Sequence, residues 1–308
     1  MKLKRVIFIA IGIVLLYVGY IGISLMSLPS VGDLADRRTS MAIQVRDWKG
    51  NYHPFTVGPK NRYWTPSASI PPEMKWAVIV AEDANFYKHE GIDVKAIRNA
   101  IRYDLEKKRM AKGASTITQQ VAKNLYLSRE KTITRKVKEI ILAMRMEQEL
   151  TKGRIIELYL NVVELGPMVY GIGNGARYYF GKPASALTPR ESAFLTAMLP
   201  GPRVAYNPYN NLQRVLKRSD KILGLLRKRG VLTEEEYQRA LAEMPNIAGM
   251  EKKIAATVVQ EAVQQPLSSA TVKSGLQREK EKGPVPSGEA PVKEGSVQTE
   301  AGGTPAAK

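Results

Sequence analysis

The sequence contains no cysteine and only two histidines, His53 and His89, among its 308 residues. Without cysteine, disulfide scaffolds, thiolate zinc sites, thiol nucleophiles and iron–sulfur clusters are all excluded. Two histidines far apart in the sequence argue against metal centres built on imidazole and against two-histidine helix motifs. Any metal would therefore be a hard cation held mainly by oxygen.

Acidic residues are in deficit, because 29 Asp and Glu stand against 47 Lys and Arg, which gives a net charge of +18. The excess is concentrated, since residues 98–138 hold twelve Lys or Arg and three acids. A field of this size attracts an anion such as nucleic acid, an acidic membrane surface or a phosphorylated substrate. Apolar residues still make up 44% of the chain, so a wholly disordered protein is excluded.

Charge is absent from one long run near the start of the chain, the 21 residues of Val6–Met26. As a helix this run would be about 31 Å long, the thickness of a hydrocarbon core, which predicts a transmembrane helix. Lys2, Lys4 and Arg5 place the N-terminus in the cytoplasm by the positive-inside rule, and the rest of the chain outside it. A buried core helix and a cleaved signal peptide are the alternatives, although signal peptides have shorter apolar regions. Nucleic acid is then not the expected partner.

Four segments follow from the pattern along the chain. We expect a cytoplasmic stub and transmembrane anchor in residues 1–28, and a linker of loops and short strands in 29–64. Residues 65–245 have apolar side chains at three- and four-residue steps and predict one mainly α-helical domain, in which Thr188-Pro189-Arg190-Glu191 marks a helix start. Residues 246–308 lack aromatic side chains and predict a disordered tail.

Two adjacent carboxylates, Glu82 and Asp83, follow an apolar helical pattern, and Phe86 and His89 come after them. The spacing predicts that Glu82, Phe86 and His89 lie near one helix face. A carboxylate held against an aromatic ring can have a raised pKa and act as a general base. The alternative is a solvated helix end with a stray pair of acids.

Three further stretches combine polar residues at helical spacing, and two of them suit an anionic ligand. Residues 113–120 are small or hydroxylated at a helix start, with Lys123 on the face of Gln120, and could bind an anion or simply cap the helix. Arg135 and Lys136 lie one helical turn before Glu139, either as a surface ion-pair ladder or as a cationic setting for a diphosphate. For the last stretch, residues 152–161, the pattern favours a structural role over ligand binding.

Taken together and in order, these stretches resemble the motifs of the peptidoglycan glycosyltransferases that polymerise lipid II, in their monofunctional biosynthetic form. The resemblance covers roughly residues 65–245, and a weaker fifth motif begins at Arg218. Departures are small, such as Ala114 where Gly is usual. The matching residues are Glu82, Asp83, Phe86, His89 and Gly91; Gly113 and Ser115 to Gln120; Arg135, Lys136 and Glu139; and Lys152, Ile155, Glu157, Tyr159 and Asn161.

The resemblance implies a lysozyme-like helical fold with a small apolar jaw at the membrane. It implies that Glu82 is the general base for the sugar 4-hydroxyl of lipid II, which attacks the anomeric carbon of the growing chain. An inverted β-1,4 link forms and undecaprenyl diphosphate leaves. Glu139 is the second catalytic candidate, by orienting the neighbouring cations or helping to hold a metal. The implied substrate-binding residues are Asp83, Phe86, His89, Thr116, Gln119, Gln120, Lys123, Arg135 and Lys136.

No cofactor is required by this interpretation, which leaves Mg²⁺ or Mn²⁺ at the diphosphate open. The expected partners are lipid II, the growing glycan chain and the cytoplasmic membrane, with other cell-wall synthesis and division proteins as further candidates. The expected location is the inner membrane, with one span, a cytoplasmic N-terminus and a periplasmic catalytic domain. No penicillin-binding transpeptidase signature is expected to be genuine, since Ser128-Arg-Glu-Lys131 has no Ser-x-Asn after it. A glycan-cleaving lysozyme-like enzyme and a non-catalytic cell-wall scaffold remain as alternatives.

Overall fold

The structure, a computed structural model, describes residues 2–107, 113–128 and 130–250. The described residues are mainly helical, as predicted. The helices are α1 (Lys2–Met26), α2 (Pro72–Glu82), α3 (Val94–Lys107), α4 (Ile117–Tyr126), α5 (Ile133–Glu149), α6 (Lys152–Val162), α7 (Ile172–Phe180), α8 (Pro189–Met198), α9 (Pro208–Lys228) and α10 (Glu234–Ala242). The strands are β1 (Met41–Arg46), β2 (Tyr52–Val57), β3 (Glu164–Gly166) and β4 (Val169–Tyr170), which form two antiparallel pairs.

The N-terminal helix α1 has the length and composition needed to cross a membrane. Its apolar stretch, Leu3–Met26, has a mean hydropathy of 2.7, and its large apolar side chains are exposed. This agrees with the apolar run found in the sequence. A signal sequence at this end of a chain would have the same properties.

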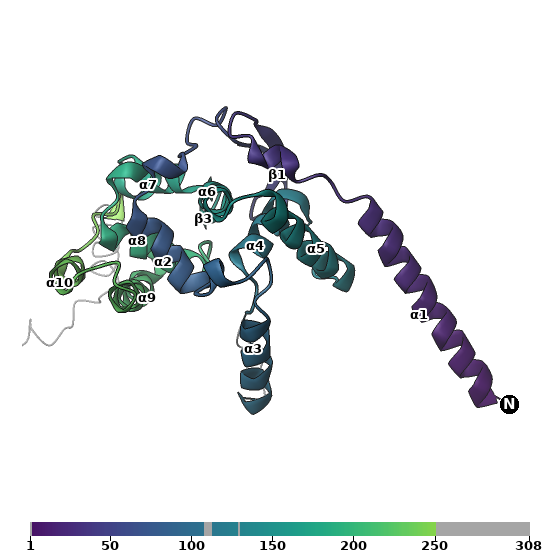
Figure 1. Ribbon diagram of the computed structural model, residues 1–308. Helices are drawn as coiled ribbons and strands as arrows, with labels where there is room; N and C mark the ends of the chain where they lie inside the picture. The colour runs from purple at the N-terminus through teal and green to yellow at the C-terminus, as the bar shows by residue number, and fades with distance from the viewer. Residues whose placement is uncertain (1, 108–112, 129, 251–308) are drawn as a thin grey trace, which may run out of the picture. The chain divides into compact units, whose positions relative to one another are not determined.

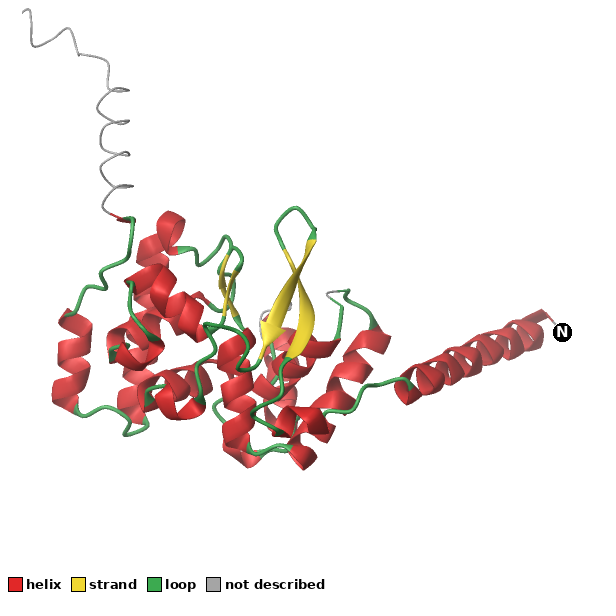
Figure 2. Ribbon diagram, turned by 90° about the horizontal axis from the view of Figure 1, so that it is seen from above, coloured by secondary structure: helices red, strands yellow, loops and turns green. Residues whose placement is uncertain are grey.

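The segment expected to be a linker, residues 29–64, contains packed structure. Strands β1 and β2 form a twisted hairpin (Figure 2), and alternate residues of β1, Ile43 and Val45, are buried on its inner face. The amide group of Asn161 on α6 then binds the backbone N–H and C=O of Thr65 at 2.8 Å each. The packed part of the chain therefore begins well before residue 65, because the hairpin buries apolar side chains against the helices.

The helices form two neighbouring packed groups. Helices α2, α8 and α9 lie against one another, and α4 packs on both α5 and α6 (Figure 1). Helices α4, α8 and α10 each begin with a capping box. In each box the threonine side chain (Thr116, Thr188 or Thr233) accepts from the backbone N–H of the Gln or Glu three residues later, and the side chain of that Gln or Glu accepts from the backbone N–H of the threonine. The start predicted at Thr188 is thereby confirmed.

The chain still packs on the domain beyond residue 245. Ile247 is buried, and the N–H of Ala248 donates to the carbonyl of Tyr179 at 2.8 Å. The disordered tail was predicted to begin at 246, whereas residues 246–250 contact α7 and its neighbours. The rest of that predicted tail, from residue 251, lies outside the described residues.

Candidate functional site

Glu82 is the last residue of α2, and its side chain is 17% exposed. Two side chains from other helices hold its carboxylate. Gln120 on α4 donates from Nε2 to Oε2 at 3.3 Å, and Arg218 on α9 donates from Nη2 to Oε1 at 3.4 Å. The carboxylate thus lies where three helices meet and stays partly open to solvent.

The pKa of Glu82 is raised above its ordinary value, chiefly because burial removes water from the charged form. The hydrogen bond from Gln120 and the positive charges of Arg218 and Lys123 oppose this shift, and the neighbouring charge of Asp83 adds to it. Burial outweighs the cations, so Glu82 has the raised pKa expected of a base. The cause is desolvation among three helices, whereas the sequence suggested contact with an aromatic ring.

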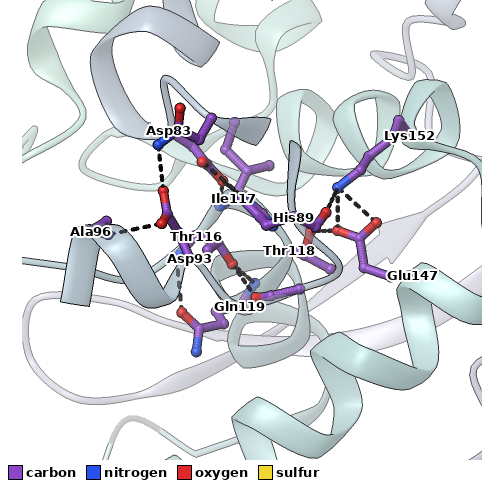
Figure 3. Close-up of polar contacts among 12 residues, drawn as sticks. Asp83, His89, Asp93, Ala96, Thr116, Ile117, Thr118, Gln119, Glu147 and Lys152 are labelled. Atoms are coloured by element: carbon purple, nitrogen blue, oxygen red, sulfur yellow. Dashed lines mark hydrogen bonds and ion pairs between the residues drawn. The ribbon is translucent and has the colours of Figure 1, made fainter. Parts of the chain in front are cut away.

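The helix α2 ends at Glu82, so Glu82, Phe86 and His89 do not share one helix face as predicted. Asp83 leaves the helical conformation, with φ of −156° and ψ of 70°. Its carboxylate accepts the backbone N–H of Ile117, at the start of α4, at 2.9 Å, and hydrogen-bonds His89 Nε2 at 3.0 Å (Figure 3). The chain turns because Asp83 supplies a negative charge to the N-terminal end of α4.

This arrangement changes the interpretation of residues 113–120 as an anion site. The first turn of α4 already holds the carboxylate of Asp83, and Gln119 closes the capping box with Thr116. Thr116 also donates from Oγ1 to the carbonyl of Gly91 at 2.7 Å. These side chains are buried, which assigns them to the framework behind the site.

Gly91 shows why the first motif ends in glycine. Its φ is +89°, and a Cβ at this position would lie 3.0 Å from the carbonyl carbon of Ala143 on α5. The close approach lets the loop after α2 contact α5.

Phe86 and His89 likewise lie behind the site. Phe86 is fully buried, and the ammonium of Lys152 lies 4.5 Å from the centre of its ring. Lys152 also donates to the carbonyl of His89 at 2.7 Å and forms an ion pair with Glu147 at 2.8 Å (Figure 3). These contacts join the first and fourth motifs, so both residues serve to fix the loop that follows Glu82.

Besides its bond to Glu82, the side chain of Gln120 contacts Tyr159, a residue that was not among the predicted site residues. The phenol of Tyr159 on α6 donates to Gln120 Oε1 at 3.3 Å, which leaves the amide nitrogen pointing at Glu82. Tyr159 is fully buried, and burial raises its pKa well above the ordinary value, so it remains a neutral donor. Arg218 was also missing from the predicted site. Both residues do occur in motifs noted in the sequence, which was the available signal.

Glu139 is buried on α5 between two cations. Arg135 Nη1 lies 2.5 Å from one carboxylate oxygen and Lys136 Nζ lies 2.5 Å from the other. Lys136 also donates to Ser115 Oγ at 3.0 Å. Glu139 therefore orients these cations, and its two oxygens are already occupied by them.

A metal at Glu139 does not fit this arrangement. Within residues 2–107, 113–128 and 130–250, no three His, Asp or Glu side chains gather as a possible metal site. Two positive charges already lie against the carboxylate of Glu139, and they disfavour a further cation there.

Glu157 and Asn161, from the fourth motif, have structural contacts. Glu157 is fully buried and pairs with Arg154 at 2.6 Å and with Arg37 at 2.8 Å. Asn161 holds the backbone of Thr65, as described above. The two residues fasten the N-terminal segment to α6.

A groove of about 450 Å³ begins beside Gln120. Helix α4, the turn after it and α5 contribute three cations to its lining, Lys123, Lys131 and Arg135. Strand β1 and Tyr52 also line the groove, together with Val162, Val163, Glu164, Tyr170, Leu199 and Pro202. The groove thus extends from Gln120, which holds Glu82, to Arg135 of the third motif. Three predicted site residues line it: Gln120, Lys123 and Arg135.

The chain matches known proteins over most of this structure. Residues 51–227, more than half of the chain, match the family described as Transglycosylase. A biosynthetic peptidoglycan transglycosylase of Nitrosomonas eutropha is 45% identical over 163 residues, which are 53% of this chain and 66% of that protein. Penicillin-binding protein 1A of Escherichia coli is 39% identical over 219 residues, 71% of this chain and 26% of that protein. The same protein of Aquifex aeolicus is 36% identical over 245 residues, 78% of this chain and 33% of that protein.

The chain therefore spans a quarter to two thirds of the length of these relatives. The family match includes the residues around the Glu82 carboxylate, from Glu82 on α2 to Arg218 on α9, whereas strand β1 of the groove precedes the matched range. The order of the motifs, the helical fold and this match agree with one another. The chain belongs to the transglycosylase family.

Proposed function

We propose that this protein is a membrane-anchored peptidoglycan glycosyltransferase that polymerises lipid II into β-1,4 glycan strands. The observation that carries the proposal is a half-buried carboxylate of raised pKa, Glu82, next to a groove lined with cations. Relatives named as peptidoglycan transglycosylase or penicillin-binding protein 1A support the same substrate class.

In the proposed reaction Glu82 takes the proton from the 4-hydroxyl of the acceptor sugar. A hydroxyl is a poor nucleophile at neutral pH, so a base within reach is required. The oxygen forms a bond to the anomeric carbon of the growing chain, while the bond from that carbon to the diphosphate oxygen breaks. The anomer inverts, and undecaprenyl diphosphate leaves with the electron pair.

The leaving diphosphate needs positive charge placed in advance. Lys123 and Arg135 lie in the groove wall and are the groups we assign to it. Glu139 holds Arg135 and Lys136 in place through contacts of 2.5 Å, so it acts as a positioning residue. Side-chain cations thus supply the stabilisation without a step that requires a metal.

Two exposed apolar features support attachment to the membrane. Helix α1 is long enough to span a bilayer, and Lys2, Lys4 and Arg5 favour a cytoplasmic N-terminus. Helix α3 exposes Val94, Ile101 and Leu105 and points away from its neighbours in Figure 1. We assign α3 to the apolar jaw, which would rest on the outer surface of the inner membrane where lipid-linked substrates lie.

The test is incubation of the detergent-solubilised protein with purified lipid II. We expect a polymer that lysozyme digests, with release of undecaprenyl diphosphate. Cleavage of preformed glycan without polymer formation would instead identify a lysozyme-like hydrolase. If the protein shows neither polymerisation nor glycan cleavage, the proposed enzyme is contradicted and a scaffold is favoured.

The pH dependence of the polymerisation rate should follow the titration of the Glu82 carboxylate. A base acts only when deprotonated, so kcat/KM should rise with pH through a midpoint above the ordinary glutamate pKa. Replacing Arg218 by Ala removes a charge that lowers this pKa, so the midpoint should move to higher pH. The measurement is initial rate against pH for both proteins. An unchanged midpoint in R218A would contradict the assignment of this limb to Glu82.

A further inference from the structure

Helix α9 and its C-cap residue carry a line of positive charges on the side that faces away from the core. At about 100° per residue, seven positions between residues 214 and 229 fall within an arc of roughly 120°. The buried positions of the helix, such as Ser219, Leu223 and Leu226, lie on the opposite side. The arc contains six cations, one apolar residue and no acid, and we call it the α9 stripe: Arg214, Lys217, Arg218, Lys221, Leu225, Lys228 and Arg229.

The nearby carboxylates are bound to residues outside the stripe. Asp220, on α9 but outside the arc, pairs with Arg190 at 2.5 Å, and Glu234 on α10 pairs with Arg227 at 2.9 Å. These acids therefore do not neutralise the α9 stripe. Arg218 contacts Glu82 at one edge of the stripe, and the proposed reaction uses none of the other five cations.

Aromatic side chains lie beside the C-terminal end of the α9 stripe. The guanidinium carbon of Arg229 lies 5.3 Å from the centre of the Trp76 ring on α2, and that ring packs 5.6 Å from the ring of Tyr87. Tyr87 is 51% exposed and belongs to the loop that leads from α2 to α3. Leu225, one turn before Arg229, is 40% exposed. The stripe thus continues through two aromatic rings to the loop before α3, the helix that we assign to the membrane jaw.

This combination of side chains is typical of a surface that rests on a bilayer. Lys and Arg bind the phosphates of lipid headgroups, while Trp, Tyr and Leu enter the interfacial layer. The charges follow the outer side of one helix over about 22 Å, at 1.5 Å per residue, so they match a flat array of anions better than one enclosed ligand. The surface of a membrane that contains anionic phospholipids presents such an array.

We propose that the α9 stripe, together with Trp76 and Tyr87, binds the headgroups of anionic phospholipids in the membrane that holds α1. This inference rests on the membrane attachment within the proposed function, and it adds a lipid class and a second contact surface to it. The contact also fixes the height of Glu82 above the lipid, since Arg218 at the edge of the stripe lies 3.4 Å from that carboxylate.

The test places a reporter on the α9 stripe of the full-length protein in bilayer nanodiscs. Because the chain contains no cysteine, Leu225→Cys supplies a single site for a spin label. The discs contain phosphatidylcholine alone or with rising fractions of phosphatidylglycerol, and the measured quantity is the accessibility of the label to a water-soluble nickel chelate. The stripe variant carries Lys217→Gln, Lys221→Gln and Lys228→Gln. The matched control removes three exposed charges elsewhere: Lys49→Gln, Lys60→Gln and Arg239→Gln.

We expect phosphatidylglycerol to shield the label from the chelate, and high salt to reverse this shielding. Each Lys or Arg near an anionic surface strengthens binding about five-fold, so the stripe variant should lose roughly 10²-fold in the binding equilibrium and most of the shielding with it. The control variant should keep the shielding. Both variants should have the melting temperature of the labelled parent by circular dichroism, because the replaced side chains are exposed.

Equal accessibility in neutral and anionic discs would overturn the inference, as would equal shielding of the stripe variant and the control. Shielding that appears in phosphatidylcholine discs only after lipid II is added would also overturn it, and would assign the α9 stripe to the peptide of the substrate. None of these measurements depends on polymerisation. An inactive wild type would therefore contradict the proposed enzyme, while the lipid contact is decided by the label alone.

Discussion

We expect the Glu82→Gln variant to polymerise lipid II about 10²- to 10⁴-fold more slowly than the wild type, because a positioned base usually contributes that much. The amide has the shape of the carboxylate and can still accept the bond from Gln120, but it cannot take the proton of the sugar hydroxyl. The measurement is the initial rate of polymer formation at the pH optimum of the wild type.

Folding should survive this change. The pKa of Glu82 is raised in the folded protein, so its ionised form lowers the stability once the pH exceeds the ordinary glutamate value. A neutral amide removes that penalty, and the melting temperature at neutral pH should stay the same or rise. Glu235→Gln, an exposed position on α10, is the matched control and should change neither quantity. Full polymerisation by Glu82→Gln would exclude Glu82 as the base.

We expect the Glu157→Ala variant to lose about 3–5 kcal/mol in the free energy of unfolding, more than any other variant proposed for this protein. Glu157 is fully buried and pairs with Arg154, whose side chain is only 5% exposed. Removing the carboxylate leaves a guanidinium buried among the helices without its counterion. For a domain of this size the melting temperature should fall by roughly 6–20 °C, as measured by circular dichroism.

The matched control is Glu234→Ala, since Glu234 is 55% exposed and pairs with Arg227 at 2.9 Å on the surface. Exposed pairs contribute about 0–1 kcal/mol, so this variant should unfold close to the wild type. Similar losses from both changes would mean that water reaches Arg154 and that the buried pair is not the fastening we describe.

Local signals in the sequence predicted the helices well. The apolar run of Val6–Met26 corresponds to α1, and the capping pattern at Thr188 marks the start of α8. These features depend on neighbours within about one helical turn, so the sequence alone contains them. The resemblance to the family also led directly to Glu82 and the third-motif cations.

Contacts between residues far apart in the sequence could not be predicted in the same way. Helical spacing placed Phe86 and His89 beside Glu82, but Asp83 ends α2 because its carboxylate binds the start of α4. The side chain that balances Glu82 from α9, Arg218, is 136 positions away. The proline and glycine content of residues 29–64 predicted a linker of loops and short strands; the strands are present, but their packing on the helices was not predicted. Each of these depends on contacts between elements that no single stretch encodes.

The distance along the chain between Glu82 and Arg218 also bears on synthesis. Ribosomes extend a chain at about 5–20 residues per second, so Arg218 emerges several seconds or more after Glu82. Until α9 packs against α2, the carboxylate lacks one of the three helices that enclose it and remains more hydrated. A nascent chain halted before α9 would therefore hold the first four motifs but not the fully enclosed Glu82 carboxylate. On the proposed function, the protein would become competent only late in its own translation, after α1 and α3 have been made.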